Sequence, residues 1–125
     1  MPNKMLNIVV VEDDPSMSQA IERILQAGGF AAALFASAEA ALEADAAELA
    51  DCLVLDIQLP GMSGFELHRQ LVLCGKEVPA VFITAHDEPA VREVAERLGG
   101  AGSYLPKPFS GRDLLDAVTR VLRLQ

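Results

Sequence analysis

The 125-residue sequence contains no tryptophan, one tyrosine and only two cysteines. Cys52 and Cys74 stand alone in apolar segments, without the C-x-x-C spacing of metal or redox sites, so we expect two small buried hydrophobic residues rather than a disulfide. Basic residues are also few, because 10 Lys and Arg against 18 Asp and Glu give a net charge of -8. This charge repels phosphate backbones and anionic headgroups, so we expect no direct binding of nucleic acid or membranes.

Long apolar runs are missing as well, since every run falls short of the roughly 18 to 20 residues that a membrane span needs. The first apolar stretch, residues 6–11, meets Glu12-Asp13-Asp14 without a small-residue cleavage site, which argues against a signal peptide. We therefore expect a soluble, cytoplasmic protein. With 51% apolar and 22% charged residues, the chain fits one domain over residues 1–125. Such a domain buries about two-thirds of its unfolded surface.

Five short apolar runs have the composition of strands that are covered on both faces. The second run, Phe-Ala-Ala-Ala-Leu-Phe, has poor strand propensity and could prolong a helix, but its position between two helix signals favours a strand. The predicted strands cover residues 6–11, 30–35, 52–56, 78–84 and about 102–105.

The segments that follow these runs have the apolar spacing of amphipathic helices. Ser37 is the expected N-cap of an Ala-rich helix that packs through Leu49 among others, His68 is expected as a surface residue, and Leu98 is expected to face inward. Five βα units with short connections and right-handed crossovers predict a doubly wound α/β sandwich around a parallel sheet. The predicted helices cover residues 15–28, 37–50, 64–74, 88–98 and 111–124.

Residues with chemical function stand at the ends of four predicted strands. Glu12 and Asp13 follow the first strand, Asp56 ends the third, Thr84 ends the fourth, and Lys107 lies just beyond the fifth. Taken singly, each has an ordinary interpretation as a helix cap, a strand residue or a surface charge. The carboxyl ends of parallel strands meet at one edge of a sheet, where ligands bind, so their joint placement predicts a site.

The chemistry of this group favours phosphoryl transfer. Three carboxylates in one crevice repel each other, so they either take up protons or bind a hard divalent cation, and Mg2+ is the natural cation at neutral pH. Mg2+ retains waters that phosphate oxygens can replace. An Asp nucleophile beside Mg2+, with Lys107 to neutralise charge and Thr84 to donate a hydrogen bond, has the parts needed to accept a phosphoryl group.

Four separated motifs carry a resemblance to a known family. They are Val-Val-Val-Glu-Asp-Asp-Pro at 9–15, Leu-Asp-Ile-Gln-Leu-Pro-Gly-Met-Ser-Gly at 55–64, Phe-Ile-Thr-Ala at 82–85 and Tyr-Leu-Pro-Lys-Pro-Phe at 104–109. In this order, and over essentially the whole chain, they resemble the receiver domain of bacterial two-component response regulators. The resemblance implies a flavodoxin-like (βα)5 fold with a five-stranded parallel sheet in order 2-1-3-4-5. Residues 60–64 and 82–87 are similar to receivers of the FixJ type, which control transcription.

The resemblance also implies how the phosphoryl group is accepted. Asp56 receives it from a sensor histidine kinase or a phosphotransfer protein, with Mg2+ bound directly by Asp13, through water by Glu12, and by the main-chain carbonyl of Gln58. Lys107 is the cationic partner of the phosphoryl group and precedes a cis Lys107-Pro108 bond. Such a domain is a signalling switch rather than an enzyme, because it catalyses only its own phosphorylation and dephosphorylation.

Further residues are assigned to the response. The resemblance implies that Thr84 is the switch hydroxyl and that Tyr104 moves between exposed and inward rotamers. Gln58 and His86 match positions that flank the path of attacking water and tune the phosphoryl lifetime, although both could equally be plain loop residues. The surface formed by the fourth helix, fifth strand and fifth helix then controls an output domain or partner, including a homodimer. Pro106 beside Lys107 stiffens the end of this strand and removes a backbone donor there.

Two other functions compete with this interpretation. A phosphatase of the haloacid dehalogenase type also uses a strand-end Asp, but it needs a second acid two residues after Asp56, where Gln58 stands. A receiver-like interaction module that is never phosphorylated, or a phosphate shuttle, remains open. The sequence also leaves open whether the chain is a single-domain regulator or part of a longer protein.

Overall fold

The computed structural model describes residues 5–123 and contains a five-stranded parallel sheet in the order β2-β1-β3-β4-β5. This order confirms the predicted flavodoxin-like arrangement. The strands are β1 Asn7–Val11, β2 Ala31–Phe35, β3 Cys52–Asp56, β4 Ala80–Thr84 and β5 Tyr104–Pro106. The helices are α1 Pro15–Ala27, α2 Ala38–Glu43, α3 Gly64–Leu73, α4 Pro89–Gly99 and α5 Gly111–Arg123. The predicted end of the last helix at Leu124 lies outside the described residues.

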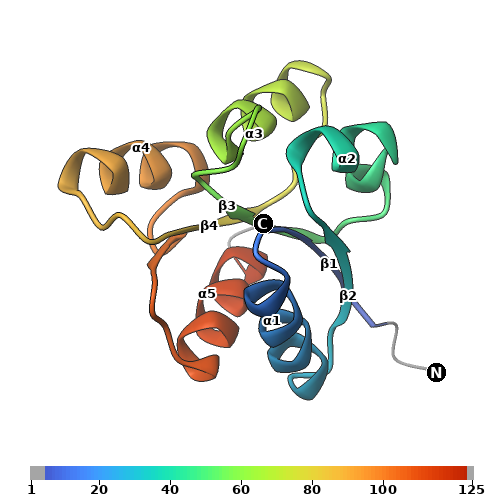
Figure 1. Cartoon of the computed structure of the whole chain (residues 1–125), viewed down its shortest axis with the longest axis vertical. Helices are drawn as coiled ribbons and strands as arrows, with labels where there is room; N and C mark the ends of the chain where they lie inside the picture. The colour runs from blue at the N-terminus through green and yellow to red at the C-terminus, as the bar shows by residue number, and fades with distance from the viewer. Residues whose placement is uncertain (1–4, 124–125) are drawn as a thin grey trace.

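The sheet is covered on both faces. In Figure 1, α2, α3 and α4 lie on one side of the strands, whereas α1 and α5 lie on the other. Because side chains alternate along a strand, successive residues of β1 enter opposite cores: Val9 packs toward α2 and α3, and Val10 packs toward α1 and α5. β3 and β4 are buried along their full lengths, as expected for interior strands of a doubly wound sheet.

The doubtful second run is a strand. β2 pairs with β1 in parallel register from Asn7↔Ala31 to Val11↔Phe35, and its residues are only partly buried or exposed because it lies at the edge of the sheet. Its ladder of backbone hydrogen bonds to β1 overrides the poor strand propensity of three successive alanines.

The Ala-rich helix is shorter than predicted. Ser37 caps it as expected, by accepting a hydrogen bond from the Ala40 N–H, but the helix ends at Glu43 rather than Ala50. Asp45 has a left-handed φ of 55°, which interrupts the helical ladder, and the following 3-10 turn leaves Leu49 78% exposed instead of packed.

An ion pair holds this region in place. Lys76, just after α3, pairs with the carboxylate of Asp45 at 2.9 Å and with that of Glu48. Hydrogen bonds to Glu48 and Asp45 raise the pKa of Lys76 to about 12. The turn that breaks α2 is therefore tied to the end of α3.

Three further predictions about the burial of single side chains were wrong. His68 is buried on the side of α3 that faces the sheet, and the centres of its ring and the Phe82 ring lie 5.4 Å apart in an edge-to-face arrangement. Leu98 is 40% exposed, because only Ala95 of α4 is fully buried against the sheet. Cys52 is buried, and burial raises the pKa of its thiol to about 12, but Cys74 at the end of α3 is exposed.

No helix among residues 5–123 combines the length and the apolar composition that crossing a bilayer requires.

The buried His68 predicts a specific pH dependence of stability. Burial lowers its pKa, so the unfolded chain binds more protons than the folded chain at pH values below about 6.5. The free energy of unfolding should therefore fall as pH decreases through this window, by at most about 1.4 kcal/mol per pH unit from this residue. Urea denaturation of the wild type and His68→Leu at pH 7.0 and 5.5 tests this. The variant should lose less stability than the wild type, and parallel losses would refute the role of His68.

Candidate functional site

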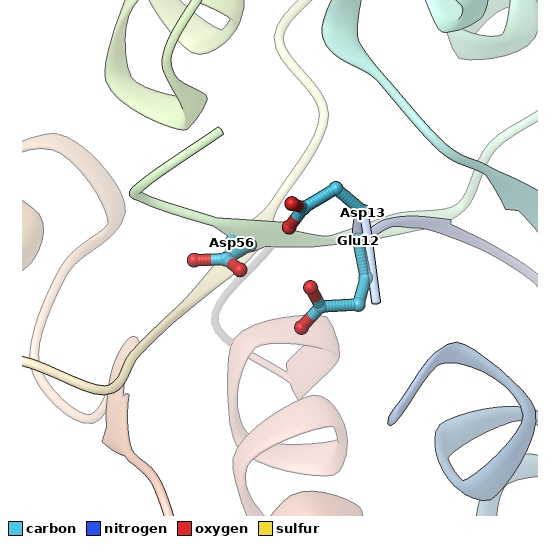
Figure 2. Close-up of side chains that lie close together, drawn as sticks. All are labelled: Glu12, Asp13 and Asp56. Carbon is cyan, nitrogen blue, oxygen red and sulfur yellow. The ribbon is translucent and has the colours of Figure 1, made fainter. Parts of the chain in front are cut away.

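The predicted acidic residues meet at the carboxyl edge of the sheet. Glu12 and Asp13 follow β1, Asp56 ends β3, and these neighbouring strands are in register up to Val11↔Leu55. Figure 2 shows that the three side chains lie close together. One carboxylate oxygen of each lies within 4.8 Å of the others. Glu12 and Asp56 are buried, whereas Asp13 is exposed. The site is therefore open to solvent on the side of Asp13.

Lys107 supplies positive charge to this cluster from a distant part of the chain. Its Nζ lies 2.7 Å from Glu12 Oε1 and 3.1 Å from Asp56 Oδ2, and its side chain is 15% exposed. Burial on its own lowers the pKa of Lys107, but hydrogen bonds to Glu12 and Asp56 and the charges of these groups outweigh it, so the pKa is raised. The ammonium group therefore stays charged at neutral pH.

The backbone around Lys107 fixes its position. Its N–H donates to the Thr84 carbonyl at 2.7 Å, which ties the end of β5 to the end of β4. The Lys107-Pro108 peptide bond is cis, as the family resemblance implied.

The loop after β3 holds the second oxygen of Asp56. The Gln58 N–H donates to Asp56 Oδ1 at 3.0 Å, while Oδ2 faces Lys107. At Gly64, a Cβ atom would lie 2.4 Å from the Asp56 carbonyl oxygen, so only glycine allows α3 to start this close to the strand. The Met62 N–H donates to the Glu39 carboxylate at 2.8 Å, and this bond lowers the pKa of Glu39. The loop is thus anchored at both ends.

Thr84 lies at the centre of a second set of contacts. It is fully buried, its hydroxyl donates to Gln58 Oε1 at 2.7 Å, and its oxygen accepts from the His86 N–H at 3.0 Å. The sequence predicted Gln58, Thr84 and His86 as separate contributors. The structure connects all three through one hydroxyl group.

Tyr104 is buried, with its hydroxyl donating to Asp87 Oδ1 at 2.9 Å. The Arg92 guanidinium lies 5.2 Å from the centre of its ring, within the range of a cation–π contact. Burial and the hydrogen bond to Asp87 raise the pKa of Tyr104. Sequence reasoning missed Asp87 and Arg92, because an acid and a base at the start of a helix are common and mark no site. The exchange of Tyr104 with an exposed rotamer stays a prediction.

The donor set suits a hard divalent cation. Three carboxylates and one ammonium group leave two negative charges among Glu12, Asp13, Asp56 and Lys107. Two of the carboxylates are buried, where uncompensated negative charge is unfavourable. Carboxylate and main-chain carbonyl oxygens are the ligands that Mg2+ prefers, so the residues fit such an ion.

Comparisons with known proteins match most of this chain to one family. Residues 8–119 match the family model described as "Response regulator receiver domain". Nodulation protein W of Bradyrhizobium diazoefficiens is 37% identical over 111 residues, which cover 89% of this chain and 48% of that protein. Response regulator MprA of Mycobacterium ulcerans is 37% identical over 118 residues, which cover 94% of this chain and 50% of that protein. The chain thus spans about half the length of the curated relatives it matches.

A solved structure gives the same picture. The response regulator StyR is 40% identical, with a TM-score of 0.85, and the match covers 97% of this chain and 61% of that one. The match in fold therefore extends over nearly the whole of this chain.

The shared ammonium group predicts the effect of removing it. In Lys107→Met, Glu12 and Asp56 stay buried without their cation, so the free energy of unfolding should fall by about 2 kcal/mol at pH 7 without divalent ions. Chemical denaturation of the wild type and of Lys107→Met at pH 7 measures this difference.

Lys76→Met is a matched control, since Lys76 pairs with two more exposed acids and its removal should change stability by less than about 1 kcal/mol. Equal effects of the two substitutions at pH 7 would show that Lys107 does not stabilise the acidic cluster.

Proposed function

Because this chain belongs to the response regulator receiver domain family, we propose that Asp56 is the residue that accepts the phosphoryl group. The domain acts in two-component signal transduction as a phosphoacceptor, and it is a signalling domain rather than a conventional enzyme. The observation that carries the assignment to Asp56 is its place at the open end of β3, where both carboxylate oxygens are held, one by Lys107 and one by the Gln58 N–H. We take residues 1–125 as one receiver domain.

The reaction transfers a phosphoryl group from phosphohistidine on a sensor kinase or phosphotransfer protein. A carboxylate oxygen of Asp56 attacks phosphorus, the P–N bond breaks, and its electron pair returns to the partner's imidazole, which takes up a proton. The product is an acyl phosphate on Asp56. Lys107, already 3.1 Å from Asp56 Oδ2, is placed to compensate the charge that the phosphoryl oxygens carry.

Mg2+ completes this site in our proposal. Asp13 and Asp56 would bind it directly, the main-chain carbonyl of Gln58 would provide another ligand, and Glu12 would contact it through water. When bound, Mg2+ would neutralise charge on the phosphoryl oxygens. Because Asp13 is exposed, the site is open to solvent on that side, where both the ion and the phosphodonor would enter.

Thr84, Gln58 and His86 control the state after transfer. The Thr84 hydroxyl donates a hydrogen bond to a phosphoryl oxygen. This bond pulls the end of β4 toward Asp56. Gln58 and His86 tune the phosphoryl lifetime, since both contact Thr84 at the edge of the site where water approaches.

The output surface is the face of α4, β5 and α5. Tyr104 on β5 contacts Arg92 on α4, so a movement of Thr84 and the loop after it reaches this face. We propose that the face controls an output domain, a partner protein or a homodimer, and that it does so in the cytoplasm. Relatives about twice as long as this chain support an attached output domain, and transcription control of the FixJ type is its proposed role.

Intact-mass analysis after incubation with a small phosphodonor tests the function. The wild type with Mg2+ should gain one phosphoryl adduct, which is absent in Asp56→Asn or without Mg2+. Asp116→Asn, at an exposed position on α5, is the control and should be modified like the wild type. If the folded, Mg2+-binding protein gains no adduct from any donor or kinase, it is a phosphate-independent interaction module instead.

The Mg2+ ligands make a separate prediction. Mg2+ at 100 times its dissociation constant should raise the free energy of unfolding by about 2.7 kcal/mol, because it binds only the folded chain. Asp13→Asn should lose most of this gain, and Asp116→Asn should keep it. Thermal melts over a Mg2+ titration measure the effect, and an undiminished gain in Asp13→Asn would remove Asp13 from the proposed ligand set.

A further inference from the structure

We propose that the Gln58 side chain is a positioning residue that holds the Thr84 hydroxyl in its unphosphorylated arrangement. This inference rests on the proposed function and deepens it, because it concerns the state before phosphorylation rather than the lifetime afterwards. The contact that carries it is the hydrogen bond from Thr84 Oγ1 to Gln58 Oε1, at 2.7 Å.

The fold brings these two residues together. β3 and β4 are neighbouring parallel strands, with Asp56 paired to Ile83, so the residues just beyond their ends lie side by side. Gln58 is fixed at this place because its own N–H donates to Asp56 Oδ1 at 3.0 Å. One residue therefore contacts the phosphoacceptor through its main chain and the switch hydroxyl through its side chain.

The argument depends on the single proton of a hydroxyl group. In this structure, the Thr84 oxygen accepts a hydrogen bond from the His86 N–H at 3.0 Å, and the Thr84 hydroxyl donates one to Gln58 Oε1. Among the described residues, the only other acceptor within reach of the Thr84 hydroxyl is the His86 carbonyl at 3.4 Å, a longer and weaker contact. To donate to a phosphoryl oxygen, the Thr84 hydroxyl must first break its hydrogen bond to Gln58.

The exchange favours the phosphorylated state only because the new bond is stronger. A bond from a hydroxyl to a neutral amide oxygen is replaced by a charge-assisted bond to a phosphoryl oxygen. Without the phosphoryl group, the bond to Gln58 keeps Thr84 away from Asp56. A typical net hydrogen bond changes a population by about two- to twelvefold, which sets the expected size of the effect.

Gln58→Met tests the bond with little change in side-chain length. It removes the acceptor Oε1 but keeps both the main-chain N–H that contacts Asp56 and the main-chain carbonyl that we assign to Mg2+. The unphosphorylated variant should populate the switched arrangement several-fold more than the wild type. Its apparent affinity for beryllofluoride with Mg2+, a mimic of the phosphoryl group, should rise by the same factor.

The readout is the amide resonance of His86, because its N–H donates to the Thr84 oxygen. In the unphosphorylated variant, this resonance should lie partway between the free and the beryllofluoride-bound positions of the wild type. Thr84→Val removes the hydroxyl but keeps the shape, and Gln58→Met should have no effect on beryllofluoride affinity in that background. A purely structural effect of Met at position 58 would persist there.

The outcomes separate the inference from the proposed function. If beryllofluoride moves the His86 resonance in both the wild type and Gln58→Met, but Gln58→Met alters neither its free position nor the affinity, the inference is wrong and the phosphoacceptor function stands. An equal gain in affinity with and without the Thr84 hydroxyl also overturns the inference. If beryllofluoride moves nothing in the wild type and Asp56 gains no phosphoryl adduct, the proposed function fails, and the inference fails with it.

Discussion

Two buried carboxylates share a single ammonium group at the carboxyl edge of the sheet, and the rest of the site is built around this unequal pairing. Glu12 and Asp56 both contact Lys107, while Asp13 stands beside them in solvent. Burying a charge without a full partner is unfavourable, so the cluster lowers the stability of the folded chain. It persists because the surrounding fold fixes these residues in place. They follow the ends of three strands, and Gly64 allows the start of α3 to lie directly against the Asp56 backbone. In the proposed function, the residual negative charge attracts Mg2+, and the bound ion would neutralise the phosphoryl oxygens.

The sequence predicted this edge because topology alone assembles it. Once residues 6–11, 52–56 and 78–84 are identified as buried parallel strands, Glu12, Asp56 and Thr84 must meet wherever the strands end. No knowledge of side-chain conformation is needed for that step. The same reasoning explains why the strand order and the division of helices between two faces followed from the βα rhythm and the family resemblance.

The wrong predictions have two physical origins. Periodicity reports which residues share a helix face, but it does not report how closely that face meets the sheet, so His68 is buried on α3 while Leu98 is exposed on α4. The early end of α2 has a local cause that composition hides. The alanines of residues 38–50 favour a helix, yet Asp45 adopts a left-handed backbone conformation. The Asp45 carboxylate pairs with Lys76, which follows the end of α3. A tertiary contact that is distant in sequence thus accompanies the break in the helix.

The contacts of Thr84 lie beyond sequence reasoning for a different reason. Which acceptor receives a hydroxyl proton depends on rotamers and on distances of a few tenths of an ångström, and these are set only when β3 and β4 are in register. Once set, the contacts are contiguous: Asp56 meets Gln58, Gln58 meets Thr84, and Thr84 meets the His86 N–H. The next residue, Asp87, binds the Tyr104 hydroxyl, and Arg92 covers the Tyr104 ring from α4.

This arrangement favours two states over a continuous range of positions. A hydroxyl group has one proton to donate, so in the proposed mechanism Thr84 bonds either to Gln58 or to a phosphoryl oxygen, and an intermediate position satisfies neither acceptor. Thr84 is fully buried, so water cannot easily replace the lost bond. Any change of its partner must also disturb the His86 N–H that it accepts, and with it the loop that carries Asp87. In the proposed function, the discreteness of this single hydrogen bond is the physical basis on which a charge added at Asp56 is converted into a change at α4.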